Sequence, residues 1–437
     1  MDLQAAFAVF ACTTIISLMS GYGMIWGILV GFCAFILTGL HRHFSLQFLL
    51  KMSWQGAKKS LIVIRVLLVI GILTALWRSA GTFAFFVAWG IRLITPHLFV
   101  IAAYILSCVL SYAIGTSFGV AGTLGVVLMT LARSSGVDEL VTAGAVMSGI
   151  YFGDRCSPAS SCALLVASLT ETDLYDNIHL MLKTAFLPVL CCTVFYGWLS
   201  YRNPMSTDSA AIVAGIEQNF SLTLWTAVPA LIMLVLPLFK VRPFNAFIAS
   251  IVTAFFCTIF IQNMTFAEAV KTAILGYTAD PGSVKALFNG GGLISMVSMC
   301  LVLFVSGTYS GIFEGTKMLE KFQSRLYMFI KKFGAYAVSF FTSLFMNAVF
   351  CNQTIGILMS HQMLAAPYSR SGRKGTELAQ DIANSCVVSA GTIPWSIACS
   401  VPLSMMGVSA KAVPYSLYLY ILPLCYALTK KIWFQDS

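Results

Sequence analysis

The sequence predicts an all-α polytopic membrane protein with room for roughly ten to twelve transmembrane helices of about 20 residues each. Composition is the first observation, because 59% of the 437 residues are hydrophobic and only 10% are charged, against about 25% charged in a soluble domain. The second is mean hydropathy, which is +0.87. The third is that apolar runs such as 247–261 and 293–305 are continuous. Membrane β-strands alternate apolar and polar residues, so helices are favoured.

The net charge of +10 comes from 26 Lys and Arg against 16 Asp and Glu. These basic residues gather in short stretches between apolar runs, which is the pattern of cytoplasmic loops rather than of a nucleic-acid surface. The 13 cysteines are scattered through apolar runs without metal-type spacing, so neither a disulfide framework nor a metal site is expected.

Several apolar segments are too short to span a bilayer and are rich in Gly, Ser, Thr or Asn. Segments of this kind are typical of broken or re-entrant helices. Residues 71–83 resemble 301–313 at an offset of 230, and residues 123–128 resemble 354–359 at an offset of 231. We therefore expect a first transmembrane repeat over 1–200 with an extra N-terminal helix, a polar linker over 201–220 and a second repeat over 221–437.

The basic residues indicate how the two repeats are oriented. Residues 316–332 contain five Lys or Arg, whereas the equivalent residues 86–102 contain only Arg92. Residues 41–59 contain four, whereas 271–289 contain two. Opposite bias in equivalent loops predicts an inverted-topology repeat, an architecture typical of secondary transporters whose substrate site lies near the bilayer midplane.

Asp154 is the first candidate for a functional residue, because it follows the uncharged run 140–153. Ionisable groups in membrane segments are costly and indicate function by default. Gly153 and Pro158 are expected to break the helix here and to expose carbonyls and hydroxyls that could bind Na+ or surround a proton site. The hydroxyl candidates are Ser157, Ser160 and Ser161. The alternative is a local ion pair between Asp154 and Arg155.

The second candidate region is 376–396, where polar residues recur at helical spacing before a break at Gly391 and Pro394. Asp381 is its candidate for a titrating or Na+-binding acid. The other predicted ligands are Asn384, Ser385, Ser389, Thr392, Trp395 and Ser396. Such a stripe could instead serve only as hydrogen-bonding contact between helices. Trp395 could stack on an organic solute, but packing is the favoured interpretation.

A third group consists of uncharged polar side chains that suit a ligand shell at membrane depth. Its members are Thr116, Thr123, Asn347, Asn352, Gln353 and Thr354. No H-E-x-x-H or phosphate-binding loop occurs, and the G-x-S-x-G string at 115–119 lies between membrane runs, where a hydrolase elbow does not form. We therefore expect no enzyme activity and no cofactor other than Na+.

Residues 148–160 and 170–184 resemble the NhaC family of sodium/proton antiporters, which has Gly-Asp-Lys-x-Ser-Pro followed by Gly-Thr-Asp-Leu-x-x-His-Ile. A looser match is Ile-Pro-Trp-Ser at 393–396, with further similarity near 406–408 and 413–416. The resemblance spans about 20–430. It implies an ion-transporter fold, coupled exchange of Na+ or H+ by alternating access, and a bacterial inner membrane location.

Two departures from the family pattern open a second hypothesis. The family has Ser-Asp-Thr-Thr where residues 160–163 read Ser-Ser-Cys-Ala, and Leu-Glu-Asp-Ser where residues 382–385 read Ile-Ala-Asn-Ser. Because two expected acids are missing, the alternative is an ion-coupled carrier of a small organic solute such as an amino acid, amine or carboxylate. A channel is a third possibility. The expected partners are an inorganic cation or a small organic solute together with membrane lipid, and a homodimer is compatible.

Overall fold

The computed structural model describes residues 3–20, 24–93, 95–205, 209–239, 241, 243–279, 285, 288–316 and 320–434. These residues form helices joined by short loops, and the described ranges hold no β-structure beyond one isolated bridge between Tyr277 and Gly290. The all-α prediction is therefore confirmed.

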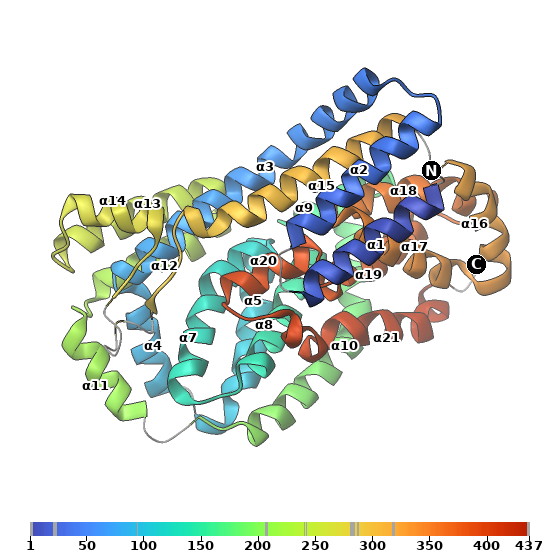
Figure 1. Ribbon diagram of the computed structural model, residues 1–437. Helices are drawn as coiled ribbons and strands as arrows, with labels where there is room; N and C mark the ends of the chain where they lie inside the picture. The colour runs from blue at the N-terminus through green and yellow to red at the C-terminus, as the bar shows by residue number, and fades with distance from the viewer. Residues whose placement is uncertain are drawn as a thin grey trace.

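The helices of the N-terminal part of the chain include the long, tilted α3 (Figure 1). They are α1 (Leu3–Met19), α2 (Met24–His41), α3 (Leu46–Ser79), α4 (Thr82–Leu93), η1 (Pro96–Leu98), α5 (Phe99–Ile114), α6 (Ser117–Val120), the π-helix η2 (Ala121–Gly125), α7 (Val126–Ser135), α8 (Glu139–Cys156), α9 (Ser161–Leu169) and α10 (Leu174–Arg202).

The C-terminal part begins with α11, which lies inside the predicted linker 201–220 and packs against α4. Its helices are α11 (Ser209–Asn219), α12 (Leu224–Leu238), α13 (Pro243–Phe260), α14 (Phe266–Leu275), η4 (Ile294–Met296), α15 (Val297–Thr316), α16 (Glu320–Phe333), α17 (Ala335–Phe350), α18 (Gln353–Arg370), α19 (Gly375–Ser389), η5 (Ala390–Thr392), α20 (Ile397–Met405), η6 (Ala410–Tyr415) and α21 (Tyr418–Trp433).

Several helices are long and apolar enough to cross a bilayer. Four qualify singly, namely 96–114, 117–135, 174–202 and 294–316. Two further candidates are bent pairs, α3 with α4 at 65° and α19 with α20 at 52°. Five shorter apolar helices accompany them within the described residues. The chain is thus a polytopic helical membrane protein with broken spans, as the short polar-interrupted segments predict.

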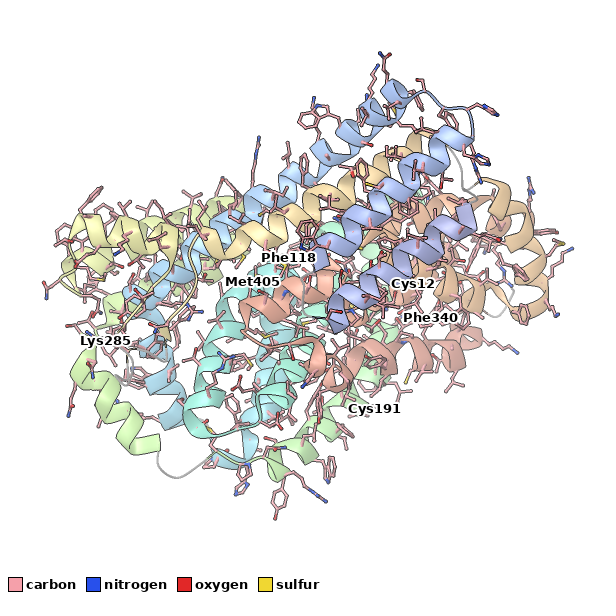
Figure 2. All side chains as sticks on the ribbon, in the orientation of Figure 1. Cys12, Phe118, Cys191, Lys285, Phe340 and Met405 are labelled. Atoms are coloured by element: carbon pink, nitrogen blue, oxygen red, sulfur yellow. The ribbon has the colours of Figure 1, made fainter. Side chains whose placement is uncertain are left out.

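The outer helices expose large apolar side chains. Phe186 and Val194 on α10 are 73% and 68% exposed, and Leu428 on α21 is 84% exposed. Side chains of these outer helices project away from the body of the molecule, as at the labelled Cys191 (Figure 2). Apolar surface of this extent fits contact with lipid tails rather than water.

The two halves repeat the same series of elements at an offset of 236 residues. Helix α5 runs from 99 to 114 and α17 from 335 to 350; α9 runs from 161 to 169 and α20 from 397 to 405. Helices α8 and α19 also begin 236 residues apart, at 139 and 375. The breaks that precede α6 and α18 match in detail. Gly115 and Cys351 adopt left-handed conformations, with φ of 74° and 53°, and each is followed by an extended residue.

This offset corrects the register of the two short sequence matches, which differ by 230 and 231. In those matches Gly81, at the turn between α3 and α4, is paired with Gly311 inside α15. The charge asymmetry survives the correction. At an offset of 236 the stretch equivalent to 41–59 is 277–295, whose only basic residue is Lys285. The opposite bias of equivalent loops that predicts inversion is therefore stronger.

The broken helices meet in the middle of the molecule. Helix α3 packs along α15 and α5 packs along α8, while α9 contacts α18 and α19. Helix α20 packs on the π-helix at Ala121–Gly125 and lies near α5 and α8 (Figure 1). Polar, irregular backbone from both halves is thus buried in protein, which is where such backbone is tolerated at membrane depth.

Candidate functional site

Two equivalent helix breaks form the frame of the site. The first separates α8 from α9 and the second separates α19 from α20. Pro158 and Pro394 occupy the same place in each break, and Ser160 and Ser396 are the residues that cap the following helices. Ser160 accepts from the backbone of Cys162 and Ala163, whereas the buried hydroxyl of Ser396 has no partner. Both predicted breaks are confirmed.

Asp154 lies in the last turn of α8, 4% exposed, where the starts of three helices converge. The side-chain amide of Gln353, the first residue of α18, donates to its Oδ2 at 2.9 Å. The thiol of Cys162 in α9 lies 3.8 Å from the same oxygen, and Ser117 at the start of α6 is within hydrogen-bonding reach. Helix N-termini favour negative charge, so this position is built for a carboxylate.

Asp154 is connected directly to the second half. The amide of Gln353 also donates to the carbonyl of Val387 in α19, at 2.8 Å. Asp154 and the predicted region 376–396 therefore lie close together, as a shared pocket requires. None of the residues that the structure describes forms a salt bridge with Asp154. Its charge is left to be balanced by a bound cation or proton.

Arg155 does not pair with Asp154, so the interpretation of a local ion pair is wrong. Successive residues on a helix point in different directions, and the guanidinium of Arg155 instead reaches α10. It donates to the carbonyl of Met181 at 3.1 Å and to the hydroxyl of Thr184 at 2.7 Å. A longer contact of 3.4 Å joins it to Tyr418 in α21. The last turn of α8 thus presents two opposite charges to two different sets of neighbours.

Asn347 ties α17 to the second broken helix. Its amide nitrogen donates to the carbonyl of Cys386 at 2.7 Å and to the hydroxyl of Ser389 at 3.0 Å. Ser111 holds the equivalent position in α5 and contacts the equivalent helix α8, donating to the carbonyl of Gly149 and accepting from the amide of Gly153. The same helix-to-helix contact is therefore made by a hydroxyl in one half and an amide in the other.

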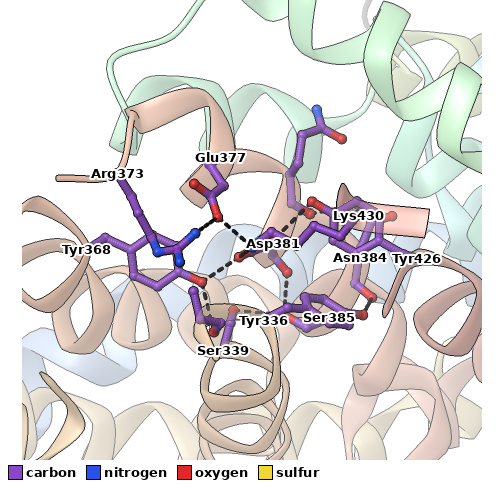
Figure 3. Close-up of polar contacts among 12 residues, drawn as sticks. Tyr336, Ser339, Tyr368, Arg373, Glu377, Asp381, Asn384, Ser385, Tyr426 and Lys430 are labelled. Atoms are coloured by element: carbon purple, nitrogen blue, oxygen red, sulfur yellow. Dashed lines mark hydrogen bonds and ion pairs between the residues drawn. The ribbon is translucent and has the colours of Figure 1, made fainter. Parts of the chain in front are cut away.

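Asp381 lies in a different environment from Asp154 (Figure 3). It is fully buried and forms an ion pair with Lys430 of α21 at 2.5 Å. It also accepts from Tyr368 at 2.5 Å and from Tyr426 at 2.9 Å. Its charge is therefore already balanced by the protein.

A second acid extends this network. Glu377, predicted to lie at the interface, is 2% exposed; it pairs with Lys430 at 2.7 Å and with Arg373. Two acids and two bases thus join α19 to α21 and to the loop before α19, with no net charge (Figure 3). Buried charges that are paired and hydrogen-bonded in this way hold helices together.

The remaining predicted residues fall into two groups. Those that bond only to nearby backbone or cap a helix are Ser157, Ser160, Thr123, Asn352, Asn384 and Thr392. Thr116 is half-buried at the start of α6, and Ser161 and Thr354 are exposed. Ser385 bonds within its helix and to the hydroxyls of Ser339 and Ser343. Trp395 donates to the carbonyl of Ala348 at 2.8 Å and packs on the core, in line with the packing interpretation.

The sequence interpretation missed four residues of the Asp381 network and treated Arg155 only as a partner of Asp154. The missed residues are Tyr368, Arg373, Tyr426 and Lys430. Lys430 is 49 residues from Asp381 and belongs to a Lys430–Lys431 pair that looks like the basic end of a last span. The only available signal was that two buried acids on one helix require cations from elsewhere.

Comparison with known proteins adds to this picture. The family model of the Na+/H+ antiporter family matches residues 3–200 and 149–429. A malate-2H+/Na+-lactate antiporter of Bacillus subtilis is 23% identical over 92% of this chain and 88% of its own length. An arginine/ornithine antiporter of Halobacterium salinarum is 27% identical over 90% and 82%. The Na+/H+ antiporter NhaC of Alkalihalophilus pseudofirmus is 23% identical over 84% and 81%.

The broken helices of two repeats, meeting around buried charge in a polytopic membrane protein, define a secondary transporter. The chain belongs to the Na+/H+ antiporter family, as the resemblance of residues 148–160 and 393–396 indicates. Its function is secondary antiport, and its relatives include exchangers of inorganic cations and exchangers of organic solutes.

Proposed function

We propose that this protein exchanges Na+ or H+ against a second solute and that Asp154 is the group that holds the cation. The observation that carries the proposal is a buried carboxylate with hydrogen-bond donors but no protein cation beside it. A charge of this kind inside a membrane protein is expensive unless a ligand or proton neutralises it. Asp381, which already has Lys430, lacks that need.

The position of Asp154 supports alternating access. Gln353 bonds both to Asp154 in the first half and to Val387 in the second half. Cation binding at Asp154 would change the charge felt by Gln353 and so bias the contact between the two halves. A ligand shifts a conformational equilibrium only through such a difference in interaction between states. The multi-pass bacterial inner membrane is the proposed location, by similarity to bacterial relatives.

Transport by purified full-length protein in proteoliposomes tests this proposal. An imposed Na+ gradient should drive proton movement, or a proton gradient Na+ movement, in wild type. Asp154→Asn should abolish coupled flux because the amide can neither titrate nor balance a cation. Asp176→Asn is the matched control, since Asp176 is exposed in the first turn of α10. Coupled flux at the wild-type rate in well-folded Asp154→Asn would remove Asp154 from the mechanism.

A further inference from the structure

Arg155 is a buried cation for which the described part of the chain provides no acid. Its side chain is fully buried, and the acceptors around it are all neutral: a carbonyl, two hydroxyls and a thiol. Its Nε has no hydrogen-bond partner. Each of the other buried bases in the Asp381 network has a carboxylate within 4 Å. An unpaired buried guanidinium is costly and indicates that its counter-charge arrives from outside.

Unsatisfied acceptors lie on the neighbouring helix. Gln380 of α19 donates to the carbonyl of Asn177, and Arg155 donates to that of Met181, one turn further along α10. Successive turns of a helix are about 5.4 Å apart, so Gln380 and Arg155 contact adjacent places on the same face of α10. The Oε1 of Gln380 and the Oδ1 of Asn384 are both buried and without partners.

Tyrosine side chains connect this cluster to an open cavity. Tyr336 and Tyr426 lie within electrostatic reach of Arg155, and their rings are 4.8 Å apart. Tyr336 also donates to the carbonyl of Asn384 and lines a cavity of about 530 Å³ whose other walls include Arg373 and Lys430. A cavity with cationic side chains on its wall therefore approaches the Arg155 cluster through Tyr336, and its charge would attract an anion.

We propose that Arg155 binds the carboxylate of a small organic solute, an amino acid or a hydroxy acid, which is the species exchanged against the cation. A planar guanidinium with an unpartnered Nε can bind a carboxylate through two parallel hydrogen bonds. The free oxygens of Gln380 and Asn384 accept from an ammonium or hydroxyl group on the same solute. This inference rests on the proposed antiport function. It adds the chemical class of the second solute and a site for it beside Asp154.

The experiment measures thermal unfolding of the purified full-length protein as lactate, malate, arginine or ornithine is titrated in. Lactamide and argininamide, which lack the carboxylate, are the matched probes. At least one acid should stabilise wild type saturably while its amide analogue does not. In Arg155→Gln the apparent Kd of that acid should rise by about tenfold or more, the loss expected for hydrogen bonds to a charged group. Arg92→Gln, at an exposed ion pair with Glu217, should bind as wild type.

Arg155→Lys keeps the charge but removes the fork, so it should also weaken binding and serves if Arg155→Gln does not fold. The proposal is overturned if none of the four acids stabilises wild type, if the amides stabilise equally, or if both Arg155 variants bind as wild type. Chloride or inorganic phosphate producing the same Arg155-dependent shift would likewise overturn it, because the site would then take an inorganic anion.

Sodium separates this inference from the proposed function. Stabilisation by Na+ should persist in Arg155→Gln and disappear in Asp154→Asn. Loss of Na+ stabilisation in neither variant would count against Asp154 as the cation site while leaving the carboxylate result intact. Conversely, unchanged carboxylate binding in the Arg155 variants would refute the present inference and leave the role of Asp154 standing.

Discussion

Asp154 and Asp381 are both buried carboxylates, yet their surroundings differ in kind. Asp381 pairs with Lys430 and accepts from two tyrosines, so the protein supplies everything that its charge requires. Asp154 receives neutral donors only. A buried ion pair of the first kind is a structural joint, whereas an uncompensated charge of the second kind is unstable without a ligand. The presence of a partner, rather than burial itself, separates the two roles.

The two acids also differ in their place within the repeat. Asp154 lies directly before the break of α8, while Asp381 lies two turns before the equivalent break of α19. The residue equivalent to Asp154 is Ala390, and the residue equivalent to Asp381 is Ala145. The halves have therefore diverged so that one retains charge at the break and the other uses charge to fix the helix in place.

The largest expected contrast is in stability. Asp381→Asn leaves Lys430 sharing only Glu377, and breaking a buried pair costs about 3–5 kcal/mol. Asp154→Asn should leave the free energy of unfolding unchanged or raise it, since it removes an unpaired buried charge. Reversible unfolding in mild detergent measures both. Equal destabilisation by the two substitutions would erase the distinction between them.

A double substitution sharpens the assignment of Asp381. Replacing both partners in Asp381→Asn/Lys430→Met removes one charge of each sign and leaves Glu377 with Arg373. Buried pairs replaced by residues of similar volume are often neutral in stability, so the double variant should recover about 2 kcal/mol or more of the loss. The single variant Lys430→Met measured alongside supplies the thermodynamic cycle. No recovery would mean that Asp381 and Lys430 are not coupled.

Gln353 tests the Asp154 side of the comparison at smaller scale. Gln353→Ala removes the donor to Asp154 and to Val387. A lost hydrogen bond to a charged group costs about 1.5–3 kcal/mol, so the apparent Kd for Na+ should change by about tenfold or more. The direction is informative: weaker Na+ binding means that Gln353 organises the site, and tighter binding means that it competes with the ion. Gln47→Ala, exposed on α3, is the control.

The smallest effect is expected at Trp395. Trp395→Phe keeps most of the ring packing and loses the single hydrogen bond to Ala348. The free energy of unfolding should fall by about 1 kcal/mol, with Na+ and carboxylate binding unchanged. A selective loss of carboxylate binding would instead place the indole in contact with the solute and restore the stacking interpretation.

The breaks could be predicted from the sequence because Gly153 with Pro158, and Gly391 with Pro394, interrupt otherwise apolar runs. Their positions were confirmed to within a few residues. The partner of Asp381 could not be predicted, since Lys430 lies on another helix and no local pattern connects them. The direction of Arg155 depends on how α8 rotates against α10, which only packing decides. The register of the repeat was misplaced because residues conserved in type were few, whereas helix ends match throughout.

The balance of charge in the buried network has a consequence for energetics across the membrane. Arg373, Glu377, Asp381 and Lys430 sum to zero, and so do Asp154 and Arg155 when no solute is bound. Movement of the empty transporter between its two orientations should then be nearly indifferent to voltage. A bound Na+ adds one uncompensated unit, and an electric potential of 100 mV acts on each unit with about 2.3 kcal/mol. The membrane potential would thus drive the cargo and leave the vehicle alone.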